Sequence, residues 1–170
     1  MKKFVYDLIY SESDTHYGHK NHGKVHLNTI LEFKPESWID VGCGFNEMIK
    51  EVRDNYVQDS WGIDFSCPGA DQQCDILDLP FPDNRWDFIS AFDVMEHIYP
   101  DKVSIALEEM RRVSKRFVFT IAFTKAFLEY KGVNAHPTVW SREVWYETIE
   151  NAGGKIWDIS KDEFFIGEWI

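Results

Sequence analysis

The fold is decided by the stretch Ser37–Asn46, which reads SWIDVGCGFN. Its first part, Trp38–Val41, is a mostly apolar run of the kind found in buried strands. The two glycines that follow, Gly42 and Gly44, let the backbone turn sharply and approach a ligand closely. Residues 46–55 then have the pattern of a helix. The stretch therefore predicts a strand, a tight turn with free backbone N–H groups, and a helix, although an ordinary tight turn would contain the same residues.

The composition is that of a well-packed globular chain of a single domain's length. Of the 170 residues, 44% are hydrophobic and 16% aromatic, which is enough for a continuous core. The formal net charge of -11 opposes non-specific attraction to polyphosphate or to an anionic membrane. No apolar run has the length of a membrane span, and the first residues become acidic too early for a secretory signal. We expect a cytoplasmic protein with a small or neutral substrate and with reduced thiols at Cys43, Cys67 and Cys74.

The rest of the chain alternates between strand and helix patterns. Residues 1–24 are polar and aromatic, with Tyr6, Tyr10 and several histidines, and we interpret them as a cover over a site. Residues 25–170 read as one domain. Its expected elements are a helix at 25–33, strands at 60–65, 74–77 and 86–92, a helix at 101–115, a strand at 116–123, a helix at 141–152, and an antiparallel hairpin of strands at 155–159 and 163–169.

Two of the expected strands end in an acidic residue. Asp64 closes the strand at 60–65 and lies 22 residues beyond Gly42, about where a nucleotide-binding βαβ unit places the acid that binds ribose hydroxyls. Asp93 follows the strand at 86–92. Ligands bind at the carboxyl ends of strands in open α/β sheets, so both acids are candidates for a site, although Asp64 could equally cap a turn.

Together, four motifs make the chain resemble the class I S-adenosylmethionine-dependent methyltransferases. They are Asp40–Gly44, Gly62–Asp64, Asp75–Phe81 and Trp86–Ile89 leading into Glu96–Ile98. The resemblance implies an α/β fold, a three-layer sandwich around a Rossmann-like, mostly parallel seven-stranded sheet with a C-terminal antiparallel hairpin. It also implies that S-adenosylmethionine lies across the carboxyl ends of the first four strands.

The resemblance further implies a set of residues that hold the cofactor. Gly42 and Gly44 would give room for the methionine part, and Asp64 would accept the ribose hydroxyls. Asp75 and Ile76 would hold the adenine, and Phe92 would lie beside the sulfonium. The set also includes Asp40, Cys43 and Phe65. Dehydrogenases share the glycine turn, but their fingerprint requires a glycine where this chain has Glu47, and that disfavours nicotinamide binding.

His97 is the first candidate for catalysis. Methyl transfer depends chiefly on binding and orientation, but a hydroxyl acceptor must also lose its proton. His97 lies at the cofactor edge and could act as the general base, or it could only pack and form hydrogen bonds.

A metal site is the alternative use of the same histidine. Asp93, Glu96 and His97 are spaced to converge at the first turn of a helix, and His136 could complete a set of oxygen and nitrogen ligands for Mg²⁺ or Mn²⁺. The pattern is similar to that of ubiquinone-pathway O-methyltransferases and, with the later histidine, of small-RNA 3'-terminal 2'-O-methyltransferases. Those families usually have Glu at the first position, where this chain has the shorter Asp93. Without a metal, His136 would line the acceptor pocket or fix its loop.

We therefore expect a methyltransferase for a small-molecule acceptor, with oxygen favoured over nitrogen. The acidic charge disfavours nucleic acid as a partner, and no membrane contact is expected. Two alternatives remain, a metal-assisted RNA 2'-O-methyltransferase and a catalytically silent cofactor-binding domain. The silent domain is disfavoured because the chain keeps all of Asp40, Gly42, Gly44, Asp64 and Asp75.

Overall fold

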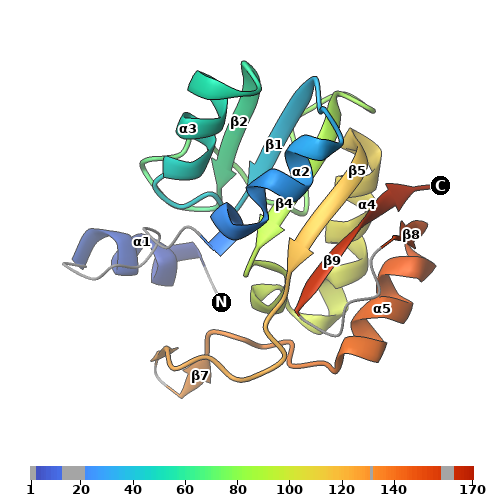
Figure 1. Cartoon of the computed structure of the whole chain (residues 1–170). Coiled ribbons are helices and arrows are strands. Elements are labelled where there is room, and N and C mark those ends of the chain that lie inside the picture. Colours follow the sequence, from blue (N-terminus) through green and yellow to red (C-terminus); the bar gives the residue numbers. More distant parts are fainter. Residues whose placement is uncertain (1–2, 13–21, 131, 158–162) are drawn as a thin grey trace.

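The structure is a computed structural model that describes residues 3–12, 22–130, 132–157 and 163–170 (Figure 1). Its centre is a seven-stranded sheet in the order β3-β2-β1-β4-β5-β9-β8. The first five strands of this order are parallel, and β9 runs antiparallel to both of its neighbours. The strands are β1 (Ser37–Val41), β2 (Asp59–Asp64), β3 (Gln72–Gln73), β4 (Trp86–Phe92), β5 (Ser114–Thr120), β8 (Gly154–Ile156) and β9 (Phe164–Trp169). The fold class expected from the sequence is confirmed.

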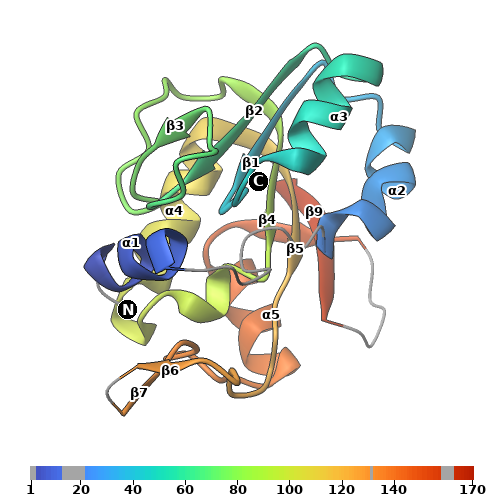
Figure 2. The same ribbon diagram turned by 90° about the vertical axis from the view of Figure 1, so that its left-hand side faces the viewer.

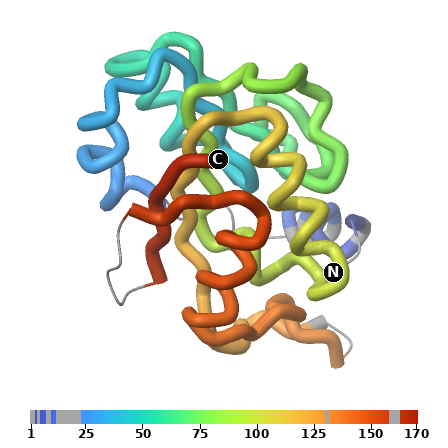
Figure 3. Tube along the Cα trace, turned by 90° about the vertical axis from the view of Figure 1, so that its right-hand side faces the viewer, coloured from blue at the N-terminus to red at the C-terminus, as the bar shows by residue number. Residues whose placement is uncertain are grey.

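Helices cover both faces of the sheet and give three layers (Figures 2 and 3). One face is covered by α2 (Leu27–Glu32) and α3 (Glu47–Asn55), and the other by α4 (Val103–Val113) and α5 (Arg142–Asn151). The shorter elements are α1 (Lys3–Glu12), η1 (His22–His26), η2 (Met95–His97), η3 (Pro100–Lys102) and a two-stranded ladder of β6 (Glu129–Tyr130) and β7 (Val133–Asn134). Within the described ranges, no helix has the length and apolar character needed to cross a membrane.

The two layers of core follow from the alternation of side chains along the strands. Trp38 of β1 and Phe88 of β4 are fully buried against α2 and α3. Ile39 and Ile89, one residue further along the same strands, are buried on the opposite face, toward α4 and α5. Both faces of these strands are covered, which explains why their sequences read as nearly continuous apolar runs.

The strand order reverses at β1, which has β2 on one side and β4 on the other. The crossover connections leave in opposite directions there, and the carboxyl ends of β1, β2 and β4 open toward one edge. Figure 1 shows α1 and the β6–β7 ladder at this same edge, below the strand arrowheads. The topology therefore predicts that a ligand site lies at this edge of the sheet.

Some boundaries differ from the expected ones. Residues 74–77 do not form the third strand; the strand is Gln72–Gln73, which pairs with the end of β2. The chain turns away after it because the Leu77 N–H donates to the Asp75 carboxylate at 3.0 Å. β5 spans Ser114–Thr120, not 116–123, and the β6–β7 ladder was not expected. Residues 13–21 of the expected cover and 158–159 of the expected hairpin lie outside the described residues.

Candidate functional site

Asp64, at the end of β2, is the best-fixed acidic side chain of this edge. It is 7% exposed. Its Oδ2 accepts a hydrogen bond from the Gly44 N–H at 3.1 Å, and its Oδ1 accepts hydrogen bonds from the Ser66 and Cys67 N–H groups at 2.9 and 2.8 Å. The carboxylate is therefore held between the glycine turn and the loop after β2, where the sequence predicted a ribose-binding acid.

The glycine turn itself requires glycine. Gly42 has φ +74°, and a Cβ on it would lie 2.3 Å from Cγ2 of Val94, in the segment after β4. The expectation of free N–H groups at this turn is wrong, because the Gly42 and Cys43 N–H groups both donate to the Ile63 carbonyl, at 2.8 and 3.0 Å. The turn is tied to β2 through these bonds and through Gly44, so it presents close backbone approach and not N–H donors.

Asp40, at the carboxyl half of β1, is buried and accepts a hydrogen bond from the Ser90 hydroxyl. Ser90 in turn accepts one from the Trp38 indole N–H at 2.8 Å. Burial raises the pKa of Asp40 to about 7, and the negative charge of Asp64 adds to this rise. Burial also raises the pKa of the neighbouring Cys43 thiol, which is therefore protonated and unreactive at neutral pH.

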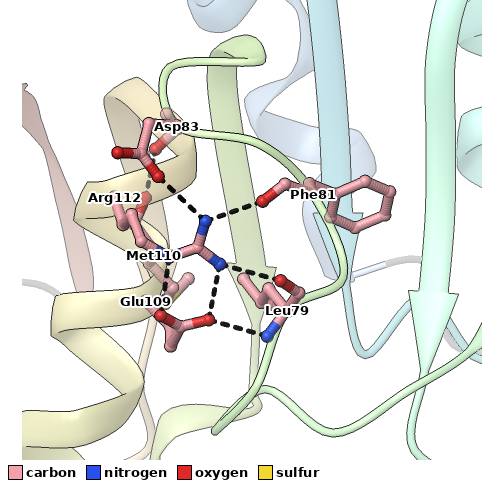
Figure 4. Close-up of polar contacts among 7 residues, drawn as sticks. Leu79, Phe81, Asp83, Glu109, Met110 and Arg112 are labelled. Carbon is pink, nitrogen blue, oxygen red and sulfur yellow. Dashed lines mark hydrogen bonds and ion pairs between the residues drawn. The ribbon is translucent and has the colours of Figure 1, made fainter.

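The predicted adenine residues lie in the turn after β3. Asp75 forms the turn described above, and Ile76 is 7% exposed and packs in the core on the α4 side. The chain that follows is clamped to α4 by Arg112, whose Nη2 donates to the Leu79 carbonyl at 2.8 Å and whose Nη1 donates to the Phe81 carbonyl at 2.7 Å (Figure 4).

The same guanidinium is bonded at every N–H group. Nε and Nη2 donate to the two oxygens of Glu109, and Nη1 donates to Asp83 at 3.1 Å. Glu109 also accepts the Leu79 N–H at 2.7 Å. Arg112 thus donates five hydrogen bonds, as many as a guanidinium has N–H groups. The loop Leu79–Asp83 is therefore fixed in relation to α4, and with it the turn that contains Asp75.

Phe92 and Phe65 are the other aromatic members of the predicted cofactor set. The Phe92 ring lies against η1, close enough that a Cβ on Gly23 would lie 2.3 Å from it, and it stacks with His26 at a centroid distance of 6.3 Å. Phe65 receives the edge of the Tyr6 ring at 6.4 Å. Both rings are thus covered by residues from the N-terminal segment.

Glu96, His97 and His136 form a second cluster at this edge, with one potential ligand atom of each lying within 4.8 Å of the others. Glu96 is fully buried. Its Oε1 accepts the Ala122 N–H at 3.0 Å, but among the described residues none donates a hydrogen bond to its Oε2. Burial raises the pKa of this carboxyl to about 8, and the nearby charges of Asp93 and Glu163 add to the rise.

The two imidazoles of this cluster cross at 86° with centroids 4.7 Å apart. Burial, and then the neighbouring His136, lower the pKa of His97 to about 4, so His97 is neutral at physiological pH. His136 Nδ1 lies 2.7 Å from the Thr124 carbonyl, which can only accept, so Nδ1 carries a proton and donates it to this hydrogen bond. Two imidazoles beside a buried carboxylate oxygen that accepts no hydrogen bond from a described residue are a donor set suited to a divalent cation.

Asp93 lies outside this cluster. Its φ of 55° is left-handed, and its Oδ1 accepts the Thr120 hydroxyl of β5 at 2.9 Å. The structure thus brings together three of the four predicted ligands.

Helix α1 lies over the same edge and contacts both groups of residues (Figures 1 and 2). Its Tyr6 hydroxyl is 3.1 Å from His97 Nδ1, and its Tyr10 hydroxyl donates to Asp64 Oδ2 at 3.3 Å. These contacts span 91 and 54 residues of sequence. Tyr6 and Tyr10 could be suspected from the aromatic character of the segment, but nothing in the sequence indicates their partners.

The structure has the architecture of the class I S-adenosylmethionine-dependent methyltransferases, a seven-stranded sheet whose order reverses at β1 and in which β9 runs antiparallel between β5 and β8. The glycine turn after β1 and Asp64 at the end of β2 lie at its switch point. A family model described as a methyltransferase domain matches residues 17–159, and the chain belongs to that family.

Individual relatives are more distant. A protein of Oryza sativa subsp. japonica, named "Probable tocopherol O-methyltransferase, chloroplastic", is 30% identical over 49% of this chain, which spans only 27% of that relative. The same fold is found in a solved complex between the Haloferax volcanii Trm112 methyltransferase activator and a methyltransferase. The TM-score is 0.72 at 16% identity, over 96% of this chain and 97% of the chain that it matches.

The fold is likewise that of the Burkholderia thailandensis 1,6-didemethyltoxoflavin-N1-methyltransferase with bound 1,6-didemethyltoxoflavin and S-adenosylhomocysteine. The TM-score is 0.69 at 13% identity, over 98% of this chain and 86% of the neighbour. At this identity the two solved structures show the fold alone.

Proposed function

We propose that the protein transfers a methyl group from S-adenosylmethionine to an oxygen of a small-molecule acceptor. The observation that carries the proposal is the arrangement of two groups at one sheet edge. The Gly44–Asp64 contact provides a fixed carboxylate for a ribose, and the cluster of Glu96, His97 and His136 lies beside it. Tyrosines of one helix contact both groups, which supports the proposal that one bound cofactor and its acceptor reach both.

The cofactor would lie across the carboxyl ends of β1, β2 and β4. Asp64 would accept the ribose hydroxyls, and Asp75 and Ile76 would hold the adenine in the turn that Arg112 stabilises. The glycine turn, with Asp40 and Cys43 beside it, would receive the methionine part. Phe65 and Phe92 would complete the apolar walls once the N-terminal residues that now cover them make room.

The acceptor hydroxyl would lose its proton in the cluster of Glu96, His97 and His136. A free imidazole with a pKa of about 4 is a weak base at neutral pH, so His97 suits a ligand better than a general base. We assign His97, His136 and the unpartnered Oε2 of Glu96 as ligands of Mg²⁺ or Mn²⁺, without Asp93. Such an ion, when bound, supplies a Lewis acid that lowers the pKa of a coordinated hydroxyl.

Two features support an acceptor that is small and carries little charge. The acidic chain opposes a polyanionic substrate such as RNA. Helix α1 covers the site through Tyr6 and Tyr10, and a site beneath one short helix suits a small molecule better than a polymer. The name of the rice relative favours oxygen as the methylated atom, whereas the Burkholderia neighbour is named for a nitrogen. The free cysteines suit a reducing, cytoplasmic compartment.

The test is a calorimetric titration with S-adenosylhomocysteine, followed by one with Mn²⁺. We expect the nucleoside to bind in the micromolar range. Glu96 has a raised pKa, so Mn²⁺ binding at pH 7 should release close to one proton, measured by repeating the titration in buffers with different ionisation enthalpies. Failure to bind S-adenosylhomocysteine would refute the proposed function, and Mn²⁺ binding that is unchanged in Glu96→Gln would remove the metal site.

A further inference from the structure

Helix α1 is docked on the loops that would hold the cofactor. The Tyr10 ring packs edge-on against Phe45 in the glycine turn, at a centroid distance of 5.8 Å. One turn earlier, Asp7 accepts the Ser66 hydroxyl at 2.6 Å, from the loop after β2. These contacts lie on either side of Asp64, whose Oδ2 receives the Tyr10 hydroxyl at 3.3 Å.

The hydrogen-bonding capacity of Asp64 is filled in this arrangement. A carboxylate offers about four lone-pair sites, and Asp64 accepts four hydrogen bonds, two on each oxygen. Three of the donors are backbone N–H groups, of Gly44, Ser66 and Cys67, which cannot leave without unfolding the turn and the loop. The fourth donor is the Tyr10 hydroxyl, a side chain on a peripheral helix.

A ribose hydroxyl can therefore reach Asp64 only at the position that Tyr10 occupies. We propose that Tyr10 competes with the ribose of the cofactor for Asp64, so that it sets the cofactor affinity and α1 must move off this carboxylate when the cofactor binds. The inference rests on the proposed function, since it takes Asp64 as the ribose acceptor.

The competition also links the two halves of the site. Tyr6 lies one helical turn before Tyr10 on the same face of α1 and contacts His97 Nδ1. A shift of α1 that frees Asp64 moves Tyr6 away from His97 as well. Cofactor binding thus opens the acceptor side, where Tyr6 now covers the imidazole, and the acceptor would enter after the cofactor.

The experiment compares the dissociation constant of S-adenosylhomocysteine for the whole chain and for Tyr10→Phe. Phenylalanine keeps the ring that packs on Phe45 and removes only the competing hydroxyl. A hydrogen bond to a charged group corresponds to about tenfold or more in affinity, and at 3.3 Å this one is long, so we expect Tyr10→Phe to bind about tenfold more tightly. Tyr99→Phe, an exposed tyrosine outside the site, should bind like the unaltered chain.

Two further comparisons separate competition from other effects. Asp7→Ala removes the Ser66 contact without touching Asp64 and should also tighten binding, because it loosens α1. The 2',3'-dideoxyribose analogue of S-adenosylhomocysteine has no hydroxyl to place on Asp64, so it should bind Tyr10→Phe and the unaltered chain equally well.

The outcomes are distinct. Equal or weaker binding of S-adenosylhomocysteine by Tyr10→Phe overturns the competition and leaves the proposed function standing, with Tyr10 as a neutral neighbour or a direct cofactor contact. If neither protein binds the nucleoside, the proposed function fails and the competition fails with it.

Discussion

Replacing Glu96 with Gln should make the protein more stable at alkaline pH. The ordinary pKa of a glutamate is 4.5, and burial raises that of Glu96 to about 8 in the folded chain. Between these two values the folded state binds more protons than the unfolded state, so the free energy of unfolding falls as the pH rises. The glutamine side chain of Glu96→Gln has no charge at any of these pH values and keeps an oxygen to accept the Ala122 N–H.

The size of the effect follows from the same two pKa values. At 1.36 kcal/mol for each pH unit, the free energy that the unaltered chain loses relative to Glu96→Gln is about 3 kcal/mol by pH 7 and about 5 kcal/mol above pH 8, as orders of magnitude. Asp40 and His97 also have shifted pKa values, but they are present in both proteins and cancel in the difference.

Urea unfolding of both proteins at intervals from pH 5 to pH 9 measures this difference. Glu168→Gln is the matched control, because Glu168 is paired with Lys155 and the pKa of its carboxyl is lowered, so its charge is constant over this range. If the free energy of unfolding changes with pH in the same way for Glu96→Gln and for the unaltered chain, Glu96 is not a buried, protonated carboxyl. Saturating Mn²⁺ should restore the alkaline stability of the unaltered chain only.

Three further substitutions test the parts of the site that we propose hold the cofactor. Asp64→Asn should bind S-adenosylhomocysteine at least tenfold more weakly in calorimetry, because an uncharged acceptor replaces the carboxylate; unchanged affinity would exclude its ribose role. Gly42→Ala should lose about 1–3 kcal/mol in urea unfolding, since its Cβ would lie 2.3 Å from Val94 at φ +74°, and Val94→Ala should recover part of this loss if the clash is the cause. Arg112→Lys should lose about 1–3 kcal/mol because an ammonium cannot reproduce the paired bonds to Glu109; an equal urea midpoint would show that the clamp contributes nothing.

The long elements of the fold were predictable because burial on both sides leaves a strong signal. Trp38–Val41 and Trp86–Phe92 are apolar almost throughout, and both are central strands. The strand at Gln72–Gln73 and the β6–β7 ladder are each only two residues long per strand, so they have no periodicity to detect. Their positions depend on tertiary contacts that the local sequence does not encode.

The candidate site was likewise predictable only in part. Topology alone predicts that His136, after β5, approaches Glu96 and His97, after β4, because the two strands are neighbours. Asp93 was grouped with them on the assumption of a regular helical turn. The structure has instead a three-residue 3-10 turn at Met95–His97, and Asp93 precedes it in a left-handed conformation that directs the carboxylate to Thr120. The contact with Thr120 and the φ angle of Asp93 determine where this carboxylate lies, and residue spacing reveals neither.

The five hydrogen bonds of Arg112 have a consequence for how the protein can diversify. The loop Leu79–Asp83 is tied to α4 so completely that an insertion there would disrupt the part of the edge that we propose holds the nucleotide. Helix α1 is attached through side-chain contacts such as that of Tyr10 to Asp64. In the β6–β7 ladder, the Asn134 side chain contacts the Ala126 backbone. We expect descendants of this chain to lengthen or exchange these two appendages, and with them the proposed acceptor, more readily than the proposed cofactor half.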